Sequence, residues 1–440
     1  MTTVLPAVAL RGDLRVPGDK SISHRALLLG ALAEGVTEIR GLGRSADTMS
    51  TAAAVRALGA QVDIAAGEDL IRVTGVGLRG LTPPAGPVDC GNAGTLMRLL
   101  QGILAGQHGR FELTGDASLS ARPQERVAAP LRAMGGDVAT TDGHAPVTVT
   151  GVGPALFATE HELPVASAQV KSALLLAGML AGDGPTVVVE PERTRDHTER
   201  MLRAAGVRVE TAGTTIRVYP AGKLKPLDIE VPGDISSAAP FLVAGSIVPG
   251  SELRLHGVNV NPTRTGLLDV LERMGARISL YDRRQVGGEP VADIEVTAAE
   301  LVATEIDARE IPLLVDEIPV WAVAAAVARG ESVVRGAQEL RAKETDRIET
   351  ICDGLRALGV RVQELPDGFR VRGIPSRLRG GVVRSAGDHR IAMLGAVAGL
   401  YSGEGVRIED PEAVAVSFPT FFESLDTVAV RATLQGDDRR

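Results

Sequence analysis

Lysine and arginine recur at the polar ends of apolar segments in this 440-residue chain. Examples are DKSISHR at 19–25, SAQVK at 167–171 and GDHR at 387–390. If each stretch begins a helix, the unpaired N–H groups and the helix dipole disfavour a cation there unless an anion lies between. Arginine binds carboxylate and phosphate in bidentate geometry, and lysine adds a point charge. This pattern predicts a site for a small substrate that carries several negative charges.

Ordinary structural roles account for part of the pattern. Ser, Asn and Asp at such positions are common N-caps. In RAKETDR at 341–347, Glu344 and Arg347 are also spaced for a salt bridge. The cations that capping leaves unexplained are Lys20, Arg25, Lys171 and Arg390. In the other loops we expect three arginines to be solvated surface charges, namely Arg126, Arg200 and Arg264.

The composition argues against several other classes of protein. A net charge of −8 and 2% aromatic residues disfavour nucleic-acid binding, which uses cationic grooves and stacking side chains. No apolar run approaches a membrane span, and the N-terminus lacks the pattern of a secretory signal. We therefore expect a soluble, cytoplasmic protein. The seven histidines show no metal-ligand spacing, so we expect no metal.

Cys90 lies in VDCGNAGT, beside one of the polar stretches. A thiol there could act as a nucleophile, but we prefer a small buried residue at the end of a strand. Cys90 and Cys352 carry no CxxC pairing. The sequence therefore predicts neither a disulfide framework nor a zinc ribbon.

A repeated unit organises the chain. Five expected helix ends share a glycine followed by a short strand: VRALGAQV (55–62), LRAMGGDV (131–138), LRAAGVRV (202–209), LERMGARI (271–278) and LRALGVRV (355–362). Each glycine is expected to end its helix in the left-handed conformation. A sixth copy, at 418–430, has Asp426 in that place. The count predicts six units of about 70 residues.

Each unit also contains an apolar helix followed by a turn and a strand, as in WAVAAAVARGESVVRG. A helix that is apolar on all sides is buried. Three such helices in each half predict an α/β fold of two similar domains. The motif VPGD, at 16–19 and again at 231–234, marks where the chain would cross between them. We expect a first domain at 17–231, a second formed by 1–16 and 232–430, and a flexible tail at 431–440.

Nine short motifs occur together along the chain: PGDKSISHR, GNAGT, ASAQVKSA, TRDHTE, NPTRTG, DEIP, RAKETDR, GDHRIAM and SFP. Through them, residues 14–425 resemble the EPSP synthases (3-phosphoshikimate 1-carboxyvinyltransferases), and in particular their class II branch. The resemblance implies two domains of three βαββαβ units each, arranged as an inside-out α/β barrel. It also implies transfer of the enolpyruvyl group of phosphoenolpyruvate to the 5-hydroxyl of shikimate 3-phosphate. Phosphate would leave through a tetrahedral addition–elimination intermediate, without a metal or organic cofactor.

The resemblance also implies roles for individual residues. Those expected to hold shikimate 3-phosphate are Lys20, Ser21, Arg25, Ser167, Ala168, Gln169, Arg195 and Lys343. Those expected to hold phosphoenolpyruvate are Lys20, Gly94, Arg122, Gln169, Arg347 and Arg390. Asp316 would bind the shikimate hydroxyls and remove the 5-hydroxyl proton. Glu344 is our choice to protonate the methylene carbon, with Lys20 as the competing candidate.

Two positions depart from the pattern of some relatives. Val416 replaces a lysine and Glu339 replaces an asparagine, so we carry over neither contact. Glyphosate is expected to compete with phosphoenolpyruvate. A UDP-N-acetylglucosamine enolpyruvyltransferase is disfavoured because SLSARPQER, at 118–126, lacks that enzyme's loop cysteine. A scaffold without activity is disfavoured because the acid and base candidates are present. We expect a monomer.

Overall fold

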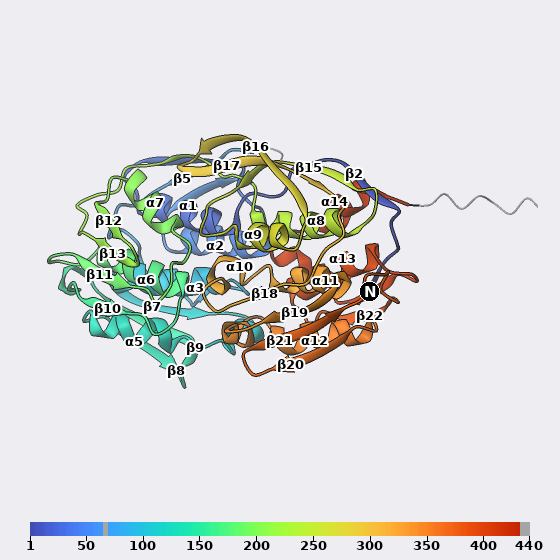
Figure 1. The fold of residues 1–440 in the computed structure, drawn as a ribbon. Coiled ribbons are helices and arrows are strands. Elements are labelled where there is room, and N and C mark those ends of the chain that lie inside the picture. Colours follow the sequence, from blue (N-terminus) through green and yellow to red (C-terminus); the bar gives the residue numbers. More distant parts are fainter. Residues whose placement is uncertain (65–68, 432–440) are drawn as a thin grey trace, which may run out of the picture.

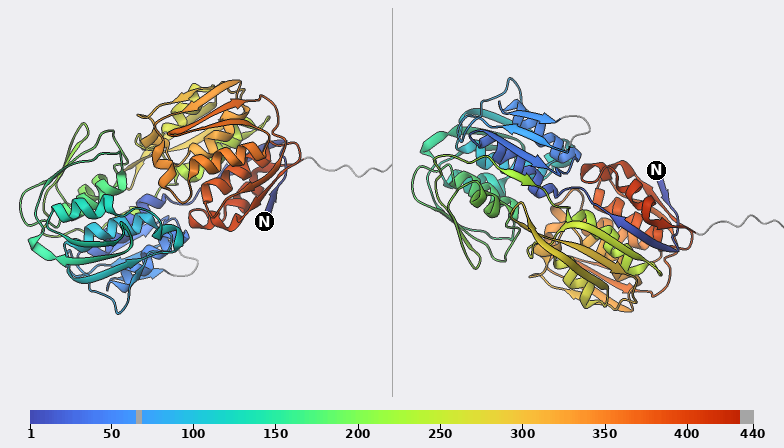
Figure 2. Two further views of the ribbon diagram at one scale, coloured as in Figure 1. Left: turned by 90° about the horizontal axis from the view of Figure 1, so that it is seen from below. Right: turned by 90° about the horizontal axis from the view of Figure 1, so that it is seen from above.

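The chain folds around two separate hydrophobic cores. The computed structural model describes residues 1–64 and 69–431. One core takes its side chains from residues 22–231, and the other from residues 4–16 and 235–428. Figure 2 shows the two resulting lobes, with the N-terminal strands beside the C-terminal segments of the second lobe. The expected tail at 431–440 falls outside the described residues from position 432 onward.

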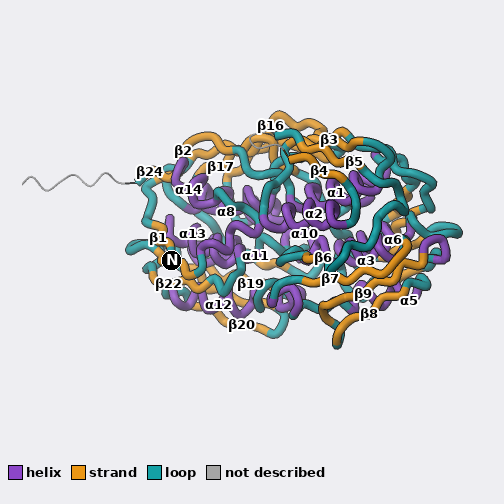
Figure 3. The backbone as a smooth tube through the Cα atoms, turned by 180° about the vertical axis from the view of Figure 1, so that it is seen from behind, coloured by secondary structure: helices purple, strands orange, loops and turns teal. Residues whose placement is uncertain are grey.

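Six helices form the interior of the lobes, with the strands outside them (Figure 3). They are α1 (Lys20–Leu32), α3 (Gly94–Ala105), α6 (Ala168–Gly178), α8 (Ile235–Ile247), α11 (Ile318–Val327) and α13 (His389–Leu400). Small residues allow close packing: a Cβ on Gly102 of α3 would lie 2.1 Å from the carbonyl oxygen of Ala173 in α6. In the second lobe, α8, α11 and α13 contact one another, and α11 is buried at every position.

Three sheets surround the helices of the first lobe (Figure 1). Their strands are β3 (Val36–Arg40), β4 (Gln61–Ile64), β5 (Ile71–Thr74), β6 (Val88–Asp89), β7 (His108–Thr114), β8 (Asp137–Thr141), β9 (His144–Val152), β10 (Glu160–Glu162), β11 (Thr186–Val189), β12 (Val209–Ala212), β13 (Thr215–Val218) and β14 (Asp228–Glu230). The strand orders are β14-β3-β5-β4, β6-β7-β9-β8 and β10-β11-β13-β12.

Three more sheets belong to the second lobe. Their strands are β1 (Thr2–Val4), β2 (Ala9–Leu14), β15 (Glu252–Asn259), β16 (Arg277–Val286), β17 (Glu289–Thr297), β18 (Glu305–Ile306), β19 (Gly330–Val334), β20 (Arg361–Leu365), β21 (Gly368–Gly373), β22 (Gly381–Arg384), β23 (Val406–Glu409) and β24 (Ala429–Val430). The orders are β16-β17-β15-β2-β24, β18-β19-β21-β20 and β1-β23-β22. Both N-terminal strands therefore pair with strands of the second lobe.

Among the described residues, five of these sheets repeat one topology. A parallel pair is followed by two antiparallel neighbours, as in β6-β7-β9-β8 and β18-β19-β21-β20. The sheet β1-β23-β22 keeps the parallel pair and one antiparallel neighbour. The predicted fold of six similar α/β units in two domains is confirmed.

Each unit carries a second, outer helix. These helices are α2 (Ala46–Ala57), α5 (Glu125–Ala133), α7 (His197–Ala204), α9 (Gly266–Arg273), α12 (Arg347–Ala357) and α14 (Phe421–Val428). The first five end at the predicted glycines, whose φ angles lie between 81° and 106°. In the sixth unit Asp426 remains inside α14, so that helix ends without a glycine. Two short helices, α4 (Ala117–Ser120) and α10 (Ile311–Leu314), lie in loops.

The two VPGD copies lie side by side where the chain crosses between the lobes. Gly18 and Gly233 form an antiparallel bridge. Asp19 and Asp234 each donate the backbone N–H to the proline carbonyl of the other copy, at 2.8 and 2.9 Å. The crossing segments therefore hold each other in register.

Candidate active site

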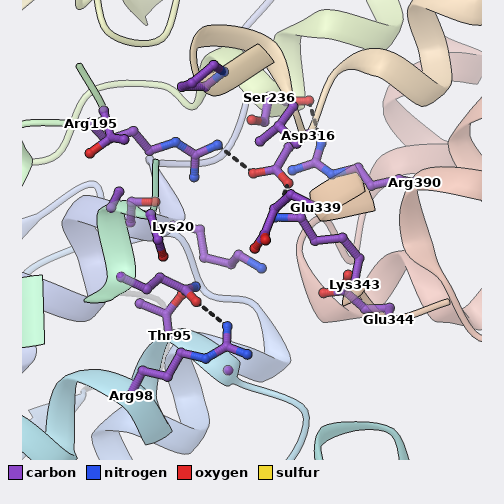
Figure 4. Close-up of a pocket in the computed structure, with 18 of the residues that line it drawn as sticks. Lys20, Thr95, Arg98, Arg195, Ser236, Asp316, Glu339, Lys343, Glu344 and Arg390 are labelled. Atoms are coloured by element: carbon purple, nitrogen blue, oxygen red, sulfur yellow. Dashed lines mark hydrogen bonds and ion pairs between the residues drawn. The ribbon is translucent and has the colours of Figure 1, made fainter. Parts of the chain in front are cut away.

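The N-terminal ends of the six buried helices meet at one cavity between the lobes (Figure 4). Residues from the first turns of five helices line it, namely Lys20, Gly94, Ala168, Ser236 and Arg390. The helix α11 contributes through Asp316, two residues before the helix begins. The cavity encloses about 120 Å³. Because helix N-termini favour anions, this position suits ligands with negative charge.

The residues predicted to form the site converge on this cavity, with one exception. Its lining includes Lys20, Ser21, Gly94, Arg122, Ser167, Ala168, Gln169, Arg195, Asp316, Lys343, Glu344, Arg347 and Arg390. Arg25 is buried behind it, one turn further along α1. The Nη1 atom of Arg25 donates to the backbone oxygen of Ser21 at 2.8 Å. Arg25 thus supports a lining residue rather than facing the cavity.

Three cations surround the carboxylate of Asp316. The Nη2 atom of Arg195 lies 2.5 Å from Oδ2, while Arg347 Nη1 and Lys343 Nζ lie 3.3 and 3.6 Å from Oδ1. Burial alone would raise the pKa of Asp316, but Lys343, Arg195 and Arg347 outweigh it and hold the pKa well below its ordinary value. With these three partners the Asp316 carboxylate is a weak proton acceptor.

The carboxylate of Glu344 lies between two arginines from different lobes. Arg347 Nη2 is 2.7 Å from Oε2, and Arg122 Nη1 is 3.5 Å from Oε1. Burial would raise the pKa of Glu344, but Arg347 and Arg122 outweigh it and hold the pKa well below its ordinary value. Glu344 and Arg347 therefore form the salt bridge that their spacing allows, and both also line the cavity.

Lys20 is the other candidate proton donor. Figure 4 shows its side chain pointing into the middle of the cavity. Its Nζ lies 2.8 Å from Oδ2 of Asp47, a residue of α2. A carboxylate thus holds the ammonium group within the space where a substrate would bind.

Sequence reasoning missed several lining residues, which include Asp47, Thr95, Arg98, Ser236, Arg264 and His389. Glu339, for which no contact was carried over from relatives, lines the cavity as well. Arg98 follows Gly94 by four positions, so both lie on one face of α3, and this spacing was the available signal. Arg98 donates to Oε1 of Gln169. Burial first, and then the neighbouring Arg126 and Arg122, lower the pKa of Arg98 to about 9. Several cations thus compete for anions at this end of the cavity.

The expectation of solvated surface charges was wrong for Arg126 and Arg264. Arg126 Nη1 lies 2.7 Å from Oε1 of Glu339 in the other lobe. Arg264 is 2% exposed and contacts carboxylates of both lobes. For Arg200 the expectation holds in part, because its side chain is 29% exposed but pairs with Asp196 at 2.9 Å. The acidic partners of Arg126 and Arg264 lie far away in sequence, so spacing could not indicate them.

Lys171 is neutralised by the protein itself. Its Nζ lies 3.0 Å from Glu190 and 2.8 Å from Glu199, and the side chain is buried. Lys171 is also absent from the residues that line the cavity. The negative charge that compensates Lys171 therefore comes from two glutamates of the protein. The prediction that Lys171 indicates an anionic substrate was wrong.

Cys90 is fully buried directly after β6, as preferred from its sequence context. Burial raises the pKa of its thiol, which disfavours the thiolate. Among the described residues, Cys90 is also absent from the cavity lining. It is a packing residue.

One cluster has the ligand types of a metal site. Asp196, His197 and Glu289 bring their ligand atoms within 4.8 Å of one another. However, Asn261 Nδ2 donates to Asp196 at 2.6 Å and to Glu289 at 2.8 Å. His197 Nδ1 lies 2.7 Å from the other oxygen of Glu289. Arg200 Nε also pairs with Asp196 at 2.9 Å, so both carboxylates have protein partners and need no metal ion.

A sequence model of the EPSP synthases (3-phosphoshikimate 1-carboxyvinyltransferases) matches residues 4–425. The chain belongs to the EPSP synthase family. A 3-phosphoshikimate 1-carboxyvinyltransferase of Acidithiobacillus ferrooxidans is 53% identical over 420 residues, which is 95% of each chain. One from Methylococcus capsulatus is 50% identical over 97% of each chain.

Solved structures agree with this assignment to the EPSP synthase family. An EPSP synthase from Acinetobacter baumannii superposes with a TM-score of 0.85, 44% identity and 98% coverage of both chains. The enolpyruvyl transferase NikO from Streptomyces tendae has a TM-score of 0.77 at 20% identity, covering 97% of this chain and 96% of its own. The second likeness shows the shared fold. Within the described part of the chain, no helix is long and apolar enough to cross a membrane.

The ion pairs of Asp316 predict how stability depends on pH. Its folded-state pKa is held below the ordinary value of 3.8, so its ionisation stabilises the folded protein above that pH. The contribution is lost as the pH falls through the lowered pKa. We expect the thermal midpoint of Asp316→Asn to lie below that of the unsubstituted protein at pH 7, and the gap to close below about pH 4. Calorimetry across this range tests it; a gap that is constant with pH contradicts it.

Proposed function

We propose that this chain transfers the enolpyruvyl group of phosphoenolpyruvate to the 5-hydroxyl of shikimate 3-phosphate and releases phosphate. The observation that carries the proposal is the single cavity where six helix N-termini bring cations and two carboxylates of both lobes together. Both substrates are multiply anionic, and their phosphates and carboxylates suit arginine forks. Membership of the EPSP synthase family supports the same reaction.

The two substrates occupy different sides of the cavity in this proposal. Shikimate 3-phosphate lies against the first lobe, held by Lys20, Ser21, Ser167, Ala168, Gln169, Arg195 and, from the second lobe, Lys343, with Arg25 behind them. Phosphoenolpyruvate lies between the lobes, held by Lys20, Gly94, Arg122, Gln169, Arg347 and Arg390. Holding both reactants together lowers the barrier by avoiding the entropy cost of their encounter.

Asp316 is the general base in this proposal. The shikimate phosphate attracts Arg195 and Lys343, both of which pair with the Asp316 carboxylate. Loss of these pairs raises the pKa of Asp316 from its lowered value and makes it a better acceptor for the 5-hydroxyl proton. The oxygen then attacks C2 of phosphoenolpyruvate while C3 takes up a proton. In the elimination, Asp316 gives its proton to the leaving phosphate while Glu344 takes one proton back from C3, so that the C2–O bond to phosphate breaks as the C2=C3 double bond forms.

Glu344 supplies the proton to C3 in this proposal. Arg122 and Arg347 now hold its pKa low, and phosphoenolpyruvate would draw both arginines towards its own charges. The carboxyl group would then be easier to protonate. Lys20 remains the competing donor because its ammonium group lies in the same cavity.

We further propose how the chain is organised as an enzyme. Residues 17–231 move as one domain against residues 1–16 with 232–430, in keeping with the two separate cores. A single chain supplies both lobes of the cavity, which supports a functional monomer. Two buried, free cysteines suit the reducing cytoplasm.

Phosphate release tests the proposed function. Purified protein would receive phosphoenolpyruvate and shikimate 3-phosphate together, each substrate alone, and both substrates with a chelator. We expect release that requires both substrates and is unaffected by the chelator. Release with UDP-N-acetylglucosamine in place of shikimate 3-phosphate would instead favour that transferase, and no release with either acceptor would favour a scaffold.

The position of Gly94 predicts how a single methyl group would affect the binding of phosphoenolpyruvate. A Cβ at this position would lie 3.2 Å from Nη1 of Arg122, tighter than ordinary contact. We expect Gly94→Ala to displace the guanidinium, raising the KM for phosphoenolpyruvate and the inhibition constant for glyphosate by about 10-fold, with kcat changed less. Steady-state kinetics with glyphosate as inhibitor measures all three. An unchanged KM, or inhibition that excess phosphoenolpyruvate cannot relieve, would contradict the assignment.

A further inference from the structure

Arg264 contacts both lobes at the wall of the cavity, although it is not among the predicted substrate ligands. It precedes α9 in the second lobe and is 2% exposed. Its Nη1 donates to Oδ2 of Asp19, in the first lobe, at 3.2 Å. Its Nη2 donates to Oδ1 of Asp234 at 3.1 Å and to Oγ of Ser236 at 2.6 Å. One buried guanidinium therefore joins the two crossing segments.

The two carboxylates also cap the helices that open each lobe. Asp19 accepts from the backbone N–H of Ile22 at 3.0 Å and so caps α1. Asp234 accepts from the backbone N–H of Ser236 at 2.8 Å and caps α8. It lies 3.4 Å from the backbone nitrogen of Lys20 as well. Arg264 therefore neutralises both caps at the point where the two helices meet.

The partners of Arg264 are connected in turn to residues that line the cavity. Lys20 directly follows Asp19 in sequence. The hydroxyl of Ser236 donates to Glu317, the neighbour of Asp316 in sequence. The backbone oxygen of Ser236 accepts from Arg390 Nη1 at 2.9 Å, drawn as a dashed line in Figure 4. A shift of the guanidinium would therefore move residues on both sides of the cavity.

We propose that Arg264 is a positioning residue that sets the orientation of one lobe against the other for the transfer reaction. Its fork holds the N-termini of α1 and α8 together, so that Lys20 faces Asp316 and Arg390 across the cavity. The inference rests on the proposed function. A planar guanidinium can donate to two carboxylates and a hydroxyl at once, which the point charge of lysine cannot do with the same geometry.

The structure predicts that loss of Arg264 lowers kcat much more than it weakens the binding of shikimate 3-phosphate. Most of the expected ligands of shikimate 3-phosphate lie within the first lobe, so its affinity should depend little on Arg264. Turnover needs groups from both lobes. For Arg264→Gln we expect kcat to fall about 100-fold, because two buried carboxylates lose their partner. The dissociation constant of shikimate 3-phosphate, from calorimetric titration, should change less than about 3-fold.

A second substitution separates positioning from damage to the fold. Asn is also a good N-cap, so Asp19→Asn removes one of the uncompensated charges while keeping the cap of α1. We expect Arg264→Gln with Asp19→Asn to recover about 10-fold of the lost kcat.

Arg200→Gln is the matched control. Arg200 also spans the lobes, through the carbonyl oxygen of Gly288 at 3.1 Å, but is more exposed, and kcat should stay within about 2-fold.

The outcomes distinguish this inference from the proposed function. Absence of phosphate release that depends on shikimate 3-phosphate, measured with the unsubstituted protein, overturns the proposed function. Normal release with an unaffected kcat in Arg264→Gln overturns the positioning role, as does a loss of substrate affinity equal to the loss of kcat.

If Arg264→Gln does not fold, Arg264→Lys keeps the buried charge without the fork. We expect this variant to lose about 10-fold in kcat, and full activity would overturn the inference.

Discussion

Replacing Asp316 with Asn is expected to lower kcat by a factor of about 10²–10⁴, the usual range for loss of a general acid or base. Asparagine keeps the shape of the side chain but cannot accept the 5-hydroxyl proton. It also removes the carboxylate that Arg195 and Lys343 contact. These cations should then be freer to hold the shikimate phosphate, so its dissociation constant should not rise. Steady-state kinetics and calorimetric titration measure the two quantities.

A surface carboxylate provides the control for Asp316→Asn. Asp353 is 66% exposed and pairs with Arg356 on the outer helix α12. Asp353→Asn should leave kcat within about 2-fold of the unsubstituted protein. The role of Asp316 as base is wrong if Asp316→Asn loses less than about 10-fold in kcat, or if its loss is explained by weaker substrate binding alone.

Glu344→Gln is expected to lower kcat by a factor of about 10²–10³, because C3 of phosphoenolpyruvate loses its proton donor. Glutamine can still lie between Arg122 and Arg347 and fill the same space. The step itself can be observed in heavy water. Protonation of C3 by solvent deuterium makes a CH2D group in the intermediate, and elimination then removes one of its three hydrogens, which leaves deuterium in the methylene group of part of the product. We expect mass spectrometry to show this incorporation slowed in proportion to kcat.

Lys20→Arg is the comparison that separates the two candidate donors. Arginine keeps a cation near Asp47 and the substrates but is a far weaker acid than the lysine ammonium group. If Glu344 is the donor, Lys20→Arg should alter KM more than the rate of deuterium incorporation. Should Glu344→Gln exchange deuterium normally while Lys20→Arg does not, the assignment must be reversed.

The fold was predictable because its signals are local. Six apolar helices and five glycines can be recognised within short windows of sequence, and Gly59 and Gly359 have the positive φ angles expected of helix ends. Duplication then repeats the same signals along the chain. The sixth unit shows the limit of this approach, because Asp426 remains inside a helix that continues to Val428.

The candidate site was predictable in a different way. The expected ligands came from a family resemblance, and the structure gathers all but Arg25 around one cavity. What sequence spacing could not reveal was which cations are neutralised by the protein. Arg264 and Asp19 are 245 positions apart, and Arg126 and Glu339 are 213 apart. Such partners become visible once the lobes are folded against each other.

The most direct test of the account follows the carbon atoms of the donor. Phosphoenolpyruvate labelled with carbon-13 at C2 would be incubated with the protein and shikimate 3-phosphate, and the products observed by NMR. The account predicts that the label appears in an enol ether attached to the 5-oxygen, with one phosphate released for each ether formed. Label that remains in phosphoenolpyruvate, or that appears as pyruvate without shikimate 3-phosphate, would contradict it.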